Sequence, residues 1–385
     1  MDDALSIVEH GGILIKGEQI IDVDKYSSLA QMHSSATLHK VLEDAVAMPG
    51  LIDAHTHICF AGSRSKDFAA RNSGIPYQEI AKQGGGIWST VKHTRQASKQ
   101  ELVGLMKNRL SRLVDLGITT VEIKSGYGLS VEEELKLLRA IDLMRNNTPL
   151  SIIPTCLAAH IVPREYENAK SYIQDILNLL VPEVKAKGLC NRFDIFVEDN
   201  AFSIEDADLY LSELKKHGFD LTVHGDQFTT GGSEIAVRHN ALSVDHLEVS
   251  TDKEIGMIAE SETVAMALPG ASLGLGCDFT PCRKILDANG ILAIASDWNP
   301  GSAPMGNLLV QASVLATYEK LSAAEVLAGI TFRAAHALGL KDRGRISKGQ
   351  KADISVFPTA DYSDILYQQG SLLPHSVWKD GLRIK

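Results

Sequence analysis

The sequence predicts an α/β fold, a (β/α)8 TIM-like barrel joined to a small composite β-sandwich domain that is formed by both termini. Two observations lead to this prediction. Between about residues 50 and 340, eight short apolar runs alternate with amphipathic segments, the order typical of a barrel of parallel strands and helices. Residues 11–47 and 344–385 instead carry short β-like runs with turn signals between them. An open doubly wound sheet is the alternative for the central region.

The eight runs predict parallel strands because they are nearly continuous in apolar residues, as expected for strands that are covered on both faces. We expect these strands at residues 51–58, 119–123, 151–159, 193–197, 220–223, 242–246, 263–268 and 291–296. The barrel then spans residues 49–343. Residues 1–48 and 344–385 form the small β domain, which is discontinuous in the sequence.

Capping boxes mark the starts of several helices between the strands. In this pattern a Ser or Thr precedes a Glu by three residues, and each side chain binds the backbone N–H of the other. The pattern occurs at Ser98, Ser130, Thr251 and Ser322. After the first of these, apolar residues follow helical spacing, and Gly117 fits the end of the helix.

Composition excludes several classes of protein. The 385 residues include 38 Lys and Arg against 48 Asp and Glu, a formal net charge of −10, with no basic run that would bind nucleic acid or an anionic membrane. No apolar run approaches the roughly 18 residues of a membrane span, and the first residues lack the pattern of a signal peptide. Five cysteines without a C-x-x-C pair indicate no disulfide framework. We therefore expect a cytoplasmic protein.

Metal-binding residue types gather where the predicted strands end. His55 and His57 stand two apart near the end of the first strand, His224 follows the fifth, His246 ends the sixth and Asp297 follows the eighth. The carboxyl ends of all barrel strands converge on one face, where barrel enzymes place their active sites. Imidazole and carboxylate ligands suit Zn or Fe. An H-x-H pair alone is a weak signal, but the whole set predicts a metal-dependent active site.

Residues 49–57, Pro-Gly-Leu-Ile-Asp-Ala-His-Thr-His, resemble the amidohydrolase superfamily, whose members are metal-dependent hydrolases built on this barrel. Further motifs resemble the imidazolonepropionase family within it. They lie at residues 60–64, 84–95, 121–129, 158–160, 241–248 and 297–301. The resemblance spans about residues 49–339. It implies hydrolysis of the cyclic amide of 4-imidazolone-5-propanoate to N-formimino-L-glutamate, a step of histidine degradation, by a metal-bound hydroxide.

The resemblance implies that His55, His57, His224 and Asp297 bind one divalent metal ion per chain, with Zn2+ favoured and Fe the alternative. Three imidazoles and one carboxylate leave room for a water, as a catalytic site requires. Binuclear relatives use a bridging lysine on a middle strand, but no lysine ends the third or fourth strand here. Lys124, after the second strand, is the weaker candidate for that role.

Catalytic roles follow from the same resemblance. Asp297 would take the proton of the water, and His246 would polarise the carbonyl and stabilise the oxyanion. Gln227 stands where many family members have Glu, and an amide cannot shuttle a proton. Arg64 would bind the propanoate with its planar fork. The predicted substrate-binding residues are Arg64, Tyr77, Tyr127, His160, Gln227, Asn299, Gly301 and Ser302.

Some alternatives stay open at this stage. Residues 271–282 depart from the aromatic-rich stretch of relatives, so the substrate could be another cyclic amide or an aminated heterocycle. A non-catalytic barrel scaffold is a third hypothesis, which the complete ligand set argues against. The predicted partner is a small anionic heterocyclic substrate, and the resemblance implies a homodimer. Because the chain is acidic, the metal and Arg64 would have to attract this substrate locally.

Overall fold

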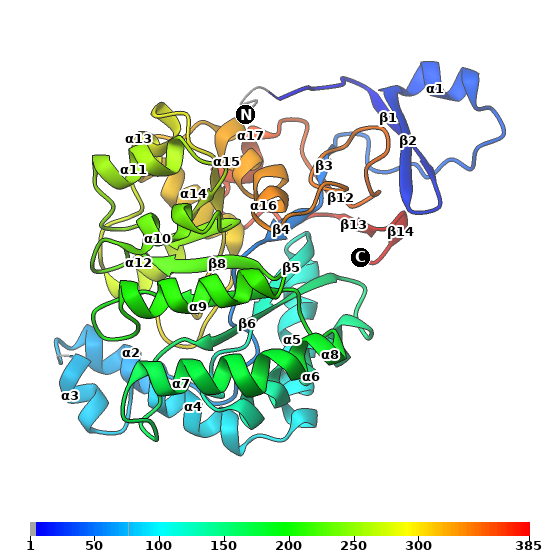
Figure 1. Cartoon of the computed structure of the whole chain (residues 1–385). Helices are drawn as coiled ribbons and strands as arrows, with labels where there is room; N and C mark the ends of the chain where they lie inside the picture. Colours follow the sequence, from blue (N-terminus) through cyan, green and yellow to red (C-terminus); the bar gives the residue numbers. More distant parts are fainter. Residues whose placement is uncertain (1–4, 76) are drawn as a thin grey trace.

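The barrel strands follow one another in space in the order of the sequence (Figure 1). The computed structural model describes residues 5–75 and 77–385, and of Tyr77, Gln78 and Ala81 the backbone only. In this part of the chain a sheet of eight parallel strands forms the centre of the molecule. They are β4 (Leu51–Asp53), β5 (Ile118–Lys124), β6 (Ser151–Ala159), β7 (Arg192–Phe196), β8 (Asp220–Gly225), β9 (Ser243–His246), β10 (Val264–Ala267) and β11 (Leu292–Ile294). The predicted barrel is confirmed.

The first and last strands are joined just beyond their carboxyl ends. The backbone N–H of Asp297 donates to the carbonyl of His55 at 3.0 Å, and that of His57 donates to the carbonyl of Trp298 at 2.9 Å. One layer below, Asp53 accepts hydrogen bonds from the backbone and the hydroxyl of Ser296 at 2.9 and 2.5 Å. The barrel therefore closes through the same residues that carry the predicted metal ligands.

The first strand is shorter than its sequence predicts. It ends at Asp53 instead of residue 58, so His55 and His57 lie on the segment that follows the strand. This segment makes isolated backbone hydrogen bonds to both neighbours, one of them from Lys124 N–H to the Thr56 carbonyl at 2.9 Å, and it forms no continuous ladder. The eight residues predicted as one strand therefore form a short strand and an irregular buried segment that leads to the site.

Helices cover the outside of the barrel (Figure 1). They are α2 (Ser65–Asn72), α3 (Tyr77–Lys82), α4 (Ile87–Gln96), α5 (Lys99–Asp115), α6 (Val131–Arg145), α7 (Ala169–Asp175), α8 (Val181–Lys187), α9 (Ile204–Lys216), α10 (Gly232–Arg238), α11 (Asp252–Ala259), α12 (Pro269–Leu275), α13 (Cys282–Asp287), α14 (Leu308–Glu319), α15 (Ala323–Gly329) and α16 (Phe332–Ala337). A π-helical turn, Ile176–Leu180, joins α7 to α8.

Helix starts follow the predicted capping chemistry. Full capping boxes open α5 at Ser98, α11 at Thr251 and α15 at Ser322, whereas Ser130 accepts only the backbone N–H of Glu133. A further box opens α9, where an Asp takes the place of Glu in the pattern. These side chains satisfy backbone N–H groups that the first helical turn leaves without partners.

Strands from both ends of the chain share one antiparallel sheet, as predicted. Its order is β14 (Leu382–Arg383), β13 (Ser376–Lys379), β12 (Ile354–Phe357) and β3 (Val46–Pro49). A separate hairpin of β1 (Gly11–Lys16) and β2 (Gln19–Lys25) lies beside it (Figure 1). Two helices, α1 (Tyr26–Met32) and α17 (Ser363–Tyr367), were not expected in these β-like segments. Helix α1 has seven residues, and Leu29 is its buried one. A helix this short shows too few apolar positions for its periodicity to be recognised in the sequence.

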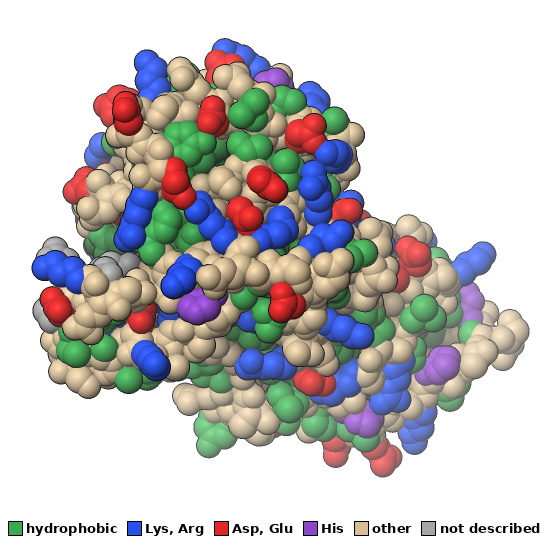
Figure 2. All heavy atoms as spheres, turned by 90° about the horizontal axis from the view of Figure 1, so that it is seen from below, with side chains coloured by type: hydrophobic (Ala, Val, Ile, Leu, Met, Phe, Trp, Pro, Cys, Tyr) green, Lys and Arg blue, Asp and Glu red, His purple; other side chains and the backbone are tan. Residues whose placement is uncertain are grey.

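Charges of both signs are interspersed on the face of the molecule that Figure 2 shows, so the excess of acidic residues forms no continuous patch there. Among the described residues, no helix combines the length and the apolar character that crossing a bilayer requires. All five cysteines are free thiols.

Candidate metal centre and active site

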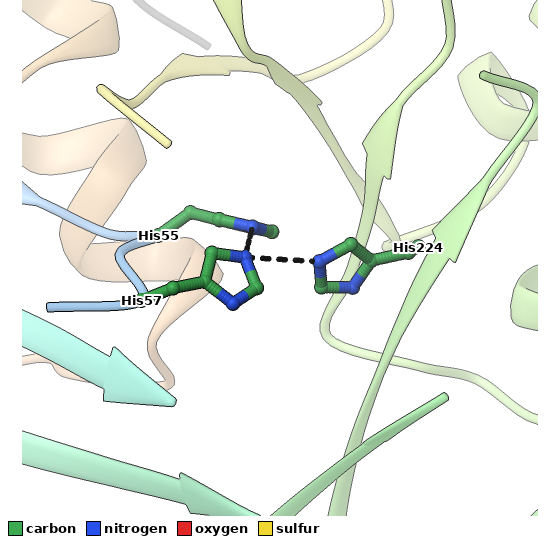
Figure 3. A group of neighbouring side chains, drawn as sticks. All are labelled: His55, His57 and His224. Atoms are coloured by element: carbon green, nitrogen blue, oxygen red, sulfur yellow. Dashed lines mark hydrogen bonds between the residues drawn. The ribbon is translucent and has the colours of Figure 1, made fainter. Parts of the chain in front are cut away.

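Four side-chain atoms meet at the mouth of the barrel. The Nε2 atom of His57 lies 3.1 Å from Nε2 of His55, 3.4 Å from Nε2 of His224 and 3.3 Å from Oδ1 of Asp297. The Nε2 atom of His55 lies 3.6 Å from the same carboxylate oxygen. Figure 3 shows the three rings pointing toward one another from two sides of the barrel. The structure thus brings the four predicted ligands together, and all are buried.

The spacing and protonation of this cluster fit a metal ion. Nδ1 of His55 lies 2.7 Å from Asp245, and Nδ1 of His224 lies 3.0 Å from Asp194. A carboxylate only accepts, so the hydrogen bond to Asp245 places the proton of His55 on Nδ1, and the nearby Asp194 carboxylate favours the same tautomer of His224. In this tautomer each Nε2 presents a lone pair to the cluster centre. Lone pairs facing one another and a carboxylate repel unless a cation lies between them. Tetrahedral ligands at 2.0–2.1 Å from Zn2+ stand roughly 3.3 Å apart, close to the observed spacings.

The three imidazoles are held in the neutral form that metal binding requires. Burial lowers the pKa of His57 to about 3, with a further contribution from the Lys124 ammonium, and burial lowers the pKa of His224 to about 4. The pKa of His55 also lies well below its ordinary value, chiefly because of burial.

The loop after β11 orients Asp297. The Asn299 amide donates to Oδ2 of Asp297 at 2.8 Å and to the Ser302 hydroxyl at 2.8 Å. Its amide oxygen accepts the backbone N–H groups of Gly301 and Ser302 at 2.7 and 2.8 Å. Asp297 itself has a φ of +50°, which is unusual outside glycine and typical of functional sites. Asn299 therefore fixes one carboxylate oxygen and leaves Oδ1 facing the histidines.

His246 stands beside the cluster in a different electrostatic state. Its Nδ1 lies 3.2 Å from the buried carboxylate of Glu248, and its carbonyl accepts the Thr280 hydroxyl at 2.5 Å. Burial acts to lower the pKa of His246, but Glu248, Asp297 and Asp245 outweigh it and raise that pKa to about 9. The backbone has a φ of +91° at this residue. A protonated imidazole held in this way can donate to a carbonyl oxygen.

Aromatic groups line the other side of the cluster. The His160 ring stacks on that of His57 with centroids 5.5 Å apart, and Tyr127 lies 6.0 Å from His57 and 5.5 Å from His160. Nδ1 of His160 lies 2.9 Å from the Gly126 carbonyl, so Nδ1 donates and Nε2 is an acceptor. The Glu134 carboxylate accepts three backbone N–H groups of the loop that carries Tyr127.

Arg64 lies where the loops after β4 and β11 meet. Its Nε donates to Asp67 at 2.8 Å, and the same carboxylate oxygen accepts the Gly86 N–H at 2.8 Å. A Cβ on Gly301 would come within 2.4 Å of Nη1 of Arg64, so a larger residue there would displace the guanidinium from its present place. Arg64 and Gly301 line a surface pocket of about 350 Å³.

Two predicted site residues, Gln227 and Tyr77, and the atypical segment 271–282 remain to be placed. Gln227 is buried, and its backbone N–H donates to Glu198, whose carboxylate also binds Phe228 and Thr229. Tyr77 begins α3, and its side chain lies outside the described part of the chain. The atypical segment 271–282 does reach the site, since it supplies Thr280 and its α12 packs on the Ser302 backbone at Gly274.

Sequence reasoning missed the buried charges beneath the predicted metal ligands. They are Glu122 on β5, Asp194 on β7 and Asp245 on β9, and the ammonium of Lys124 lies among them. The sequence did contain a signal for them, since each of the three acidic residues lies within a predicted buried strand. A buried charge requires a partner, so such residues indicate a buried network of charges.

Comparisons with known proteins place this geometry in a family. The model of the Amidohydrolase family matches residues 46–383. An imidazolonepropionase of Deinococcus deserti is 40% identical over 385 residues, covering 100% of this chain and 92% of the relative. One of Fusobacterium nucleatum subsp. nucleatum is 38% identical over 383 residues, covering 98% and 92%.

Solved structures share the fold at low identity. A 5-methylcytosine deaminase from Klebsiella pneumoniae, liganded with phosphonocytosine, has a TM-score of 0.74 at 14% identity and covers 97% of this chain and 94% of its own. An adenosine deaminase from Xanthomonas campestris with bound zinc has a TM-score of 0.72 at 17% identity and covers 98% and 88%. The near full-length matches above 30% identity are decisive, and the chain belongs to the amidohydrolase family and, within it, to the imidazolonepropionase family.

Proposed function

We propose that this chain hydrolyses 4-imidazolone-5-propanoate to N-formimino-L-glutamate with one divalent metal ion, Zn2+ in preference to Fe. The observation that supports this proposal most is the cluster of three imidazole nitrogens and one carboxylate oxygen, spaced as a tetrahedral metal requires. His55, His57, His224 and Asp297 would hold the metal. Nitrogen and oxygen donors of this kind bind both Zn and Fe, and the approach of the spacings to tetrahedral values favours Zn.

The chemistry divides among the residues of the chain. A divalent metal in this site supplies a hydroxide nucleophile at neutral pH and Lewis acidity toward the carbonyl. Asp297 takes the proton of the attacking water at Oδ2, where the Ser302 hydroxyl at 3.3 Å can turn from donor to acceptor. The same carboxyl group then gives this proton to the ring nitrogen as the C–N bond breaks, so that protons and electrons balance.

His246 stabilises the charge that develops on the carbonyl oxygen. The Glu248 carboxylate, 3.2 Å from Nδ1 of His246, favours the protonated form of this ring, whose Nε2 can then donate to the carbonyl oxygen. A charged donor in a buried site strengthens its hydrogen bond as the oxygen becomes an oxyanion. His246 thus stabilises the oxyanion through a hydrogen bond, whereas Asp297 carries a proton from the water to the ring nitrogen.

Arg64 selects a substrate that carries a carboxylate. Asp67 engages Nε, so the Nη side of the guanidinium stays available to bind the propanoate beside Gly301. Tyr127, His160 and Gln227 complete the substrate contacts in this proposal. The local charge of Arg64 and the metal offsets the net charge of −10, which would otherwise repel an anionic substrate.

Hydrolytic deamination of a neutral heterocycle is the competing function, and the substrate decides between the two. Metal-loaded protein should consume 4-imidazolone-5-propanoate and release no ammonia from a panel of purines, pyrimidines and triazines. Arg64→Gln should cripple the first reaction. Ammonia release from a neutral base that Arg64→Gln leaves unchanged would show that the site serves a deaminase.

A further inference from the structure

A single buried ammonium lies beneath the metal ligands. Nζ of Lys124 is 2.7 Å from Oδ2 of Asp194, 2.9 Å from Oε1 of Glu122 and 3.8 Å from Oδ2 of Asp245. The side chains of all four residues are at most 2% exposed. Lys124 is the last residue of β5, and the three carboxylates come from β5, β7 and β9, so the ammonium lies inside the barrel.

Each of these carboxylates reaches a part of the metal site. Asp245 holds Nδ1 of His55 at 2.7 Å, and Asp194 holds Nδ1 of His224 at 3.0 Å. Glu122 accepts the backbone N–H of Thr56, the residue between His55 and His57, at 3.1 Å. One cation therefore lies among the carboxylates beside His55 and His224 and the carboxylate that holds the backbone between His55 and His57.

The surroundings of this ammonium have the composition of a cation site. Ligand atoms of Asp194, His224 and Asp245 lie within 4.8 Å of one another, a second group that could hold a metal ion in addition to the histidine cluster. Two carboxylate oxygens lie at hydrogen-bond distance from Nζ and a third lies at 3.8 Å, so negative groups surround this position as they would surround a small cation. A carbamate formed on Lys124 would instead place a fourth negative group among three carboxylates.

We propose that the Lys124 ammonium occupies the place of a second metal ion and thereby restricts the centre to one. The proposal rests on the metal centre of the proposed function. Unlike a bound ion, an ammonium that is part of the chain stays in place at every metal concentration, and it leaves the carboxylates oriented toward the histidines. Lys124 is in this sense a positioning residue, since it acts on the metal through Asp194, Asp245 and Glu122.

Removing this ammonium should open the second place. Met keeps the apolar stem of Lys and lacks its terminal atom, so Lys124→Met leaves three buried carboxylates without a cation beside them. A divalent ion can compensate them, because carboxylate oxygens bind Zn2+ at 2.0–2.2 Å. After equilibration with excess Zn2+ and dialysis, we expect about two equivalents per chain by elemental analysis for Lys124→Met and about one for the unaltered chain.

Lys379→Met is the matched control. Lys379 is equally buried and paired with Asp353 at 3.0 Å and Asp380 at 2.6 Å, but it lies on β13, away from the barrel mouth. This variant should keep about one equivalent of metal, because the same chemical change then acts outside the centre. Lys124→Arg, which keeps the cation, should also keep one.

Circular dichroism establishes whether each variant is folded. If Lys124→Met does not fold, the double variant Lys124→Met/Glu122→Gln, which removes one charge of each sign, replaces it in the same titration. A folded variant that binds a single equivalent, at any affinity, overturns the proposal. A count of zero in the unaltered chain would instead refute the metal centre itself, so the two failures are distinguishable.

Discussion

Replacing Asp245 by Asn removes the charged acceptor that holds His55, while the shape of the side chain stays the same. In the structure, Oδ2 of Asp245 accepts Nδ1–H of His55 at 2.7 Å and the Thr222 hydroxyl at 3.2 Å. The amide oxygen of Asn can take both hydrogen bonds. The substitution therefore removes charge and keeps the ring orientation, and its effect reports how far the carboxylate strengthens His55 as a metal ligand.

The expected loss follows from the two kinds of hydrogen bond. A hydrogen bond to a charged group contributes about 1.5–3 kcal/mol, whereas a neutral one contributes about 0.5–1.5 kcal/mol. The difference between the midpoints of these ranges, about 1.25 kcal/mol, corresponds to a roughly eightfold weaker metal affinity. Changes to such outer partners commonly reduce metal affinity about 10- to 100-fold, and Asn should lie at the lower end of this range.

Competition with a chelator of known affinity measures the effect. Asp208→Asn serves as the control, because Asp208 contacts Nε2 of His239 at 2.9 Å on the surface, far from the cluster. Asp245→Asn should raise the Kd for Zn2+ about tenfold, and Asp208→Asn should leave it unchanged. An unchanged Kd for Asp245→Asn would refute the claim that this carboxylate orients and strengthens a metal-binding His55.

Further predictions address other parts of the account. Arg64→Lys loses the planar fork for the propanoate and should raise KM for 4-imidazolone-5-propanoate about 10- to 100-fold at unchanged metal content; an equal KM would remove Arg64 from substrate binding. His246→Ala should lower kcat about 100- to 1,000-fold and keep one metal per chain, so a loss of metal would reassign His246 as a ligand. Chelation should lower the free energy of unfolding by about 2.7 kcal/mol relative to protein with free metal at 100 times its Kd, as chemical denaturation can measure. Ser98→Ala should cost about 1 kcal/mol of stability with kcat/KM unchanged, and a change in activity would contradict a purely structural cap.

Sequence patterns predicted the barrel well because most strands are rich in apolar residues and several helices begin at a capping Ser or Thr. The residues 151–159 predicted as a strand coincide with β6, where both faces are covered by packing. The first strand was predicted too long, because the residues after Asp53 are buried, polar ones included, without forming a ladder. Hydrophobicity reports burial, and it does not distinguish a strand from an irregular buried segment.

The candidate site was predictable where residues lie at or just beyond the carboxyl ends of strands, as His55, His224 and Asp297 do. The structure adds what sequence spacing could not provide, namely which carboxylate lies behind which histidine. Asp194 and His224 are 30 residues apart in the chain, yet their side chains lie at 3.0 Å because β7 and β8 are neighbours. Asn299, predicted as a substrate contact, uses its amide on Asp297 and Ser302, a choice that only the loop conformation determines.

The most direct test combines a metal count with a substrate assay on one preparation. Protein loaded with Zn2+ should contain about one equivalent per chain and should convert 4-imidazolone-5-propanoate to N-formimino-L-glutamate, and the His57→Ala variant should lose both properties together. Turnover of this substrate by protein from which the metal has been removed, or no turnover by fully loaded protein, would contradict the account.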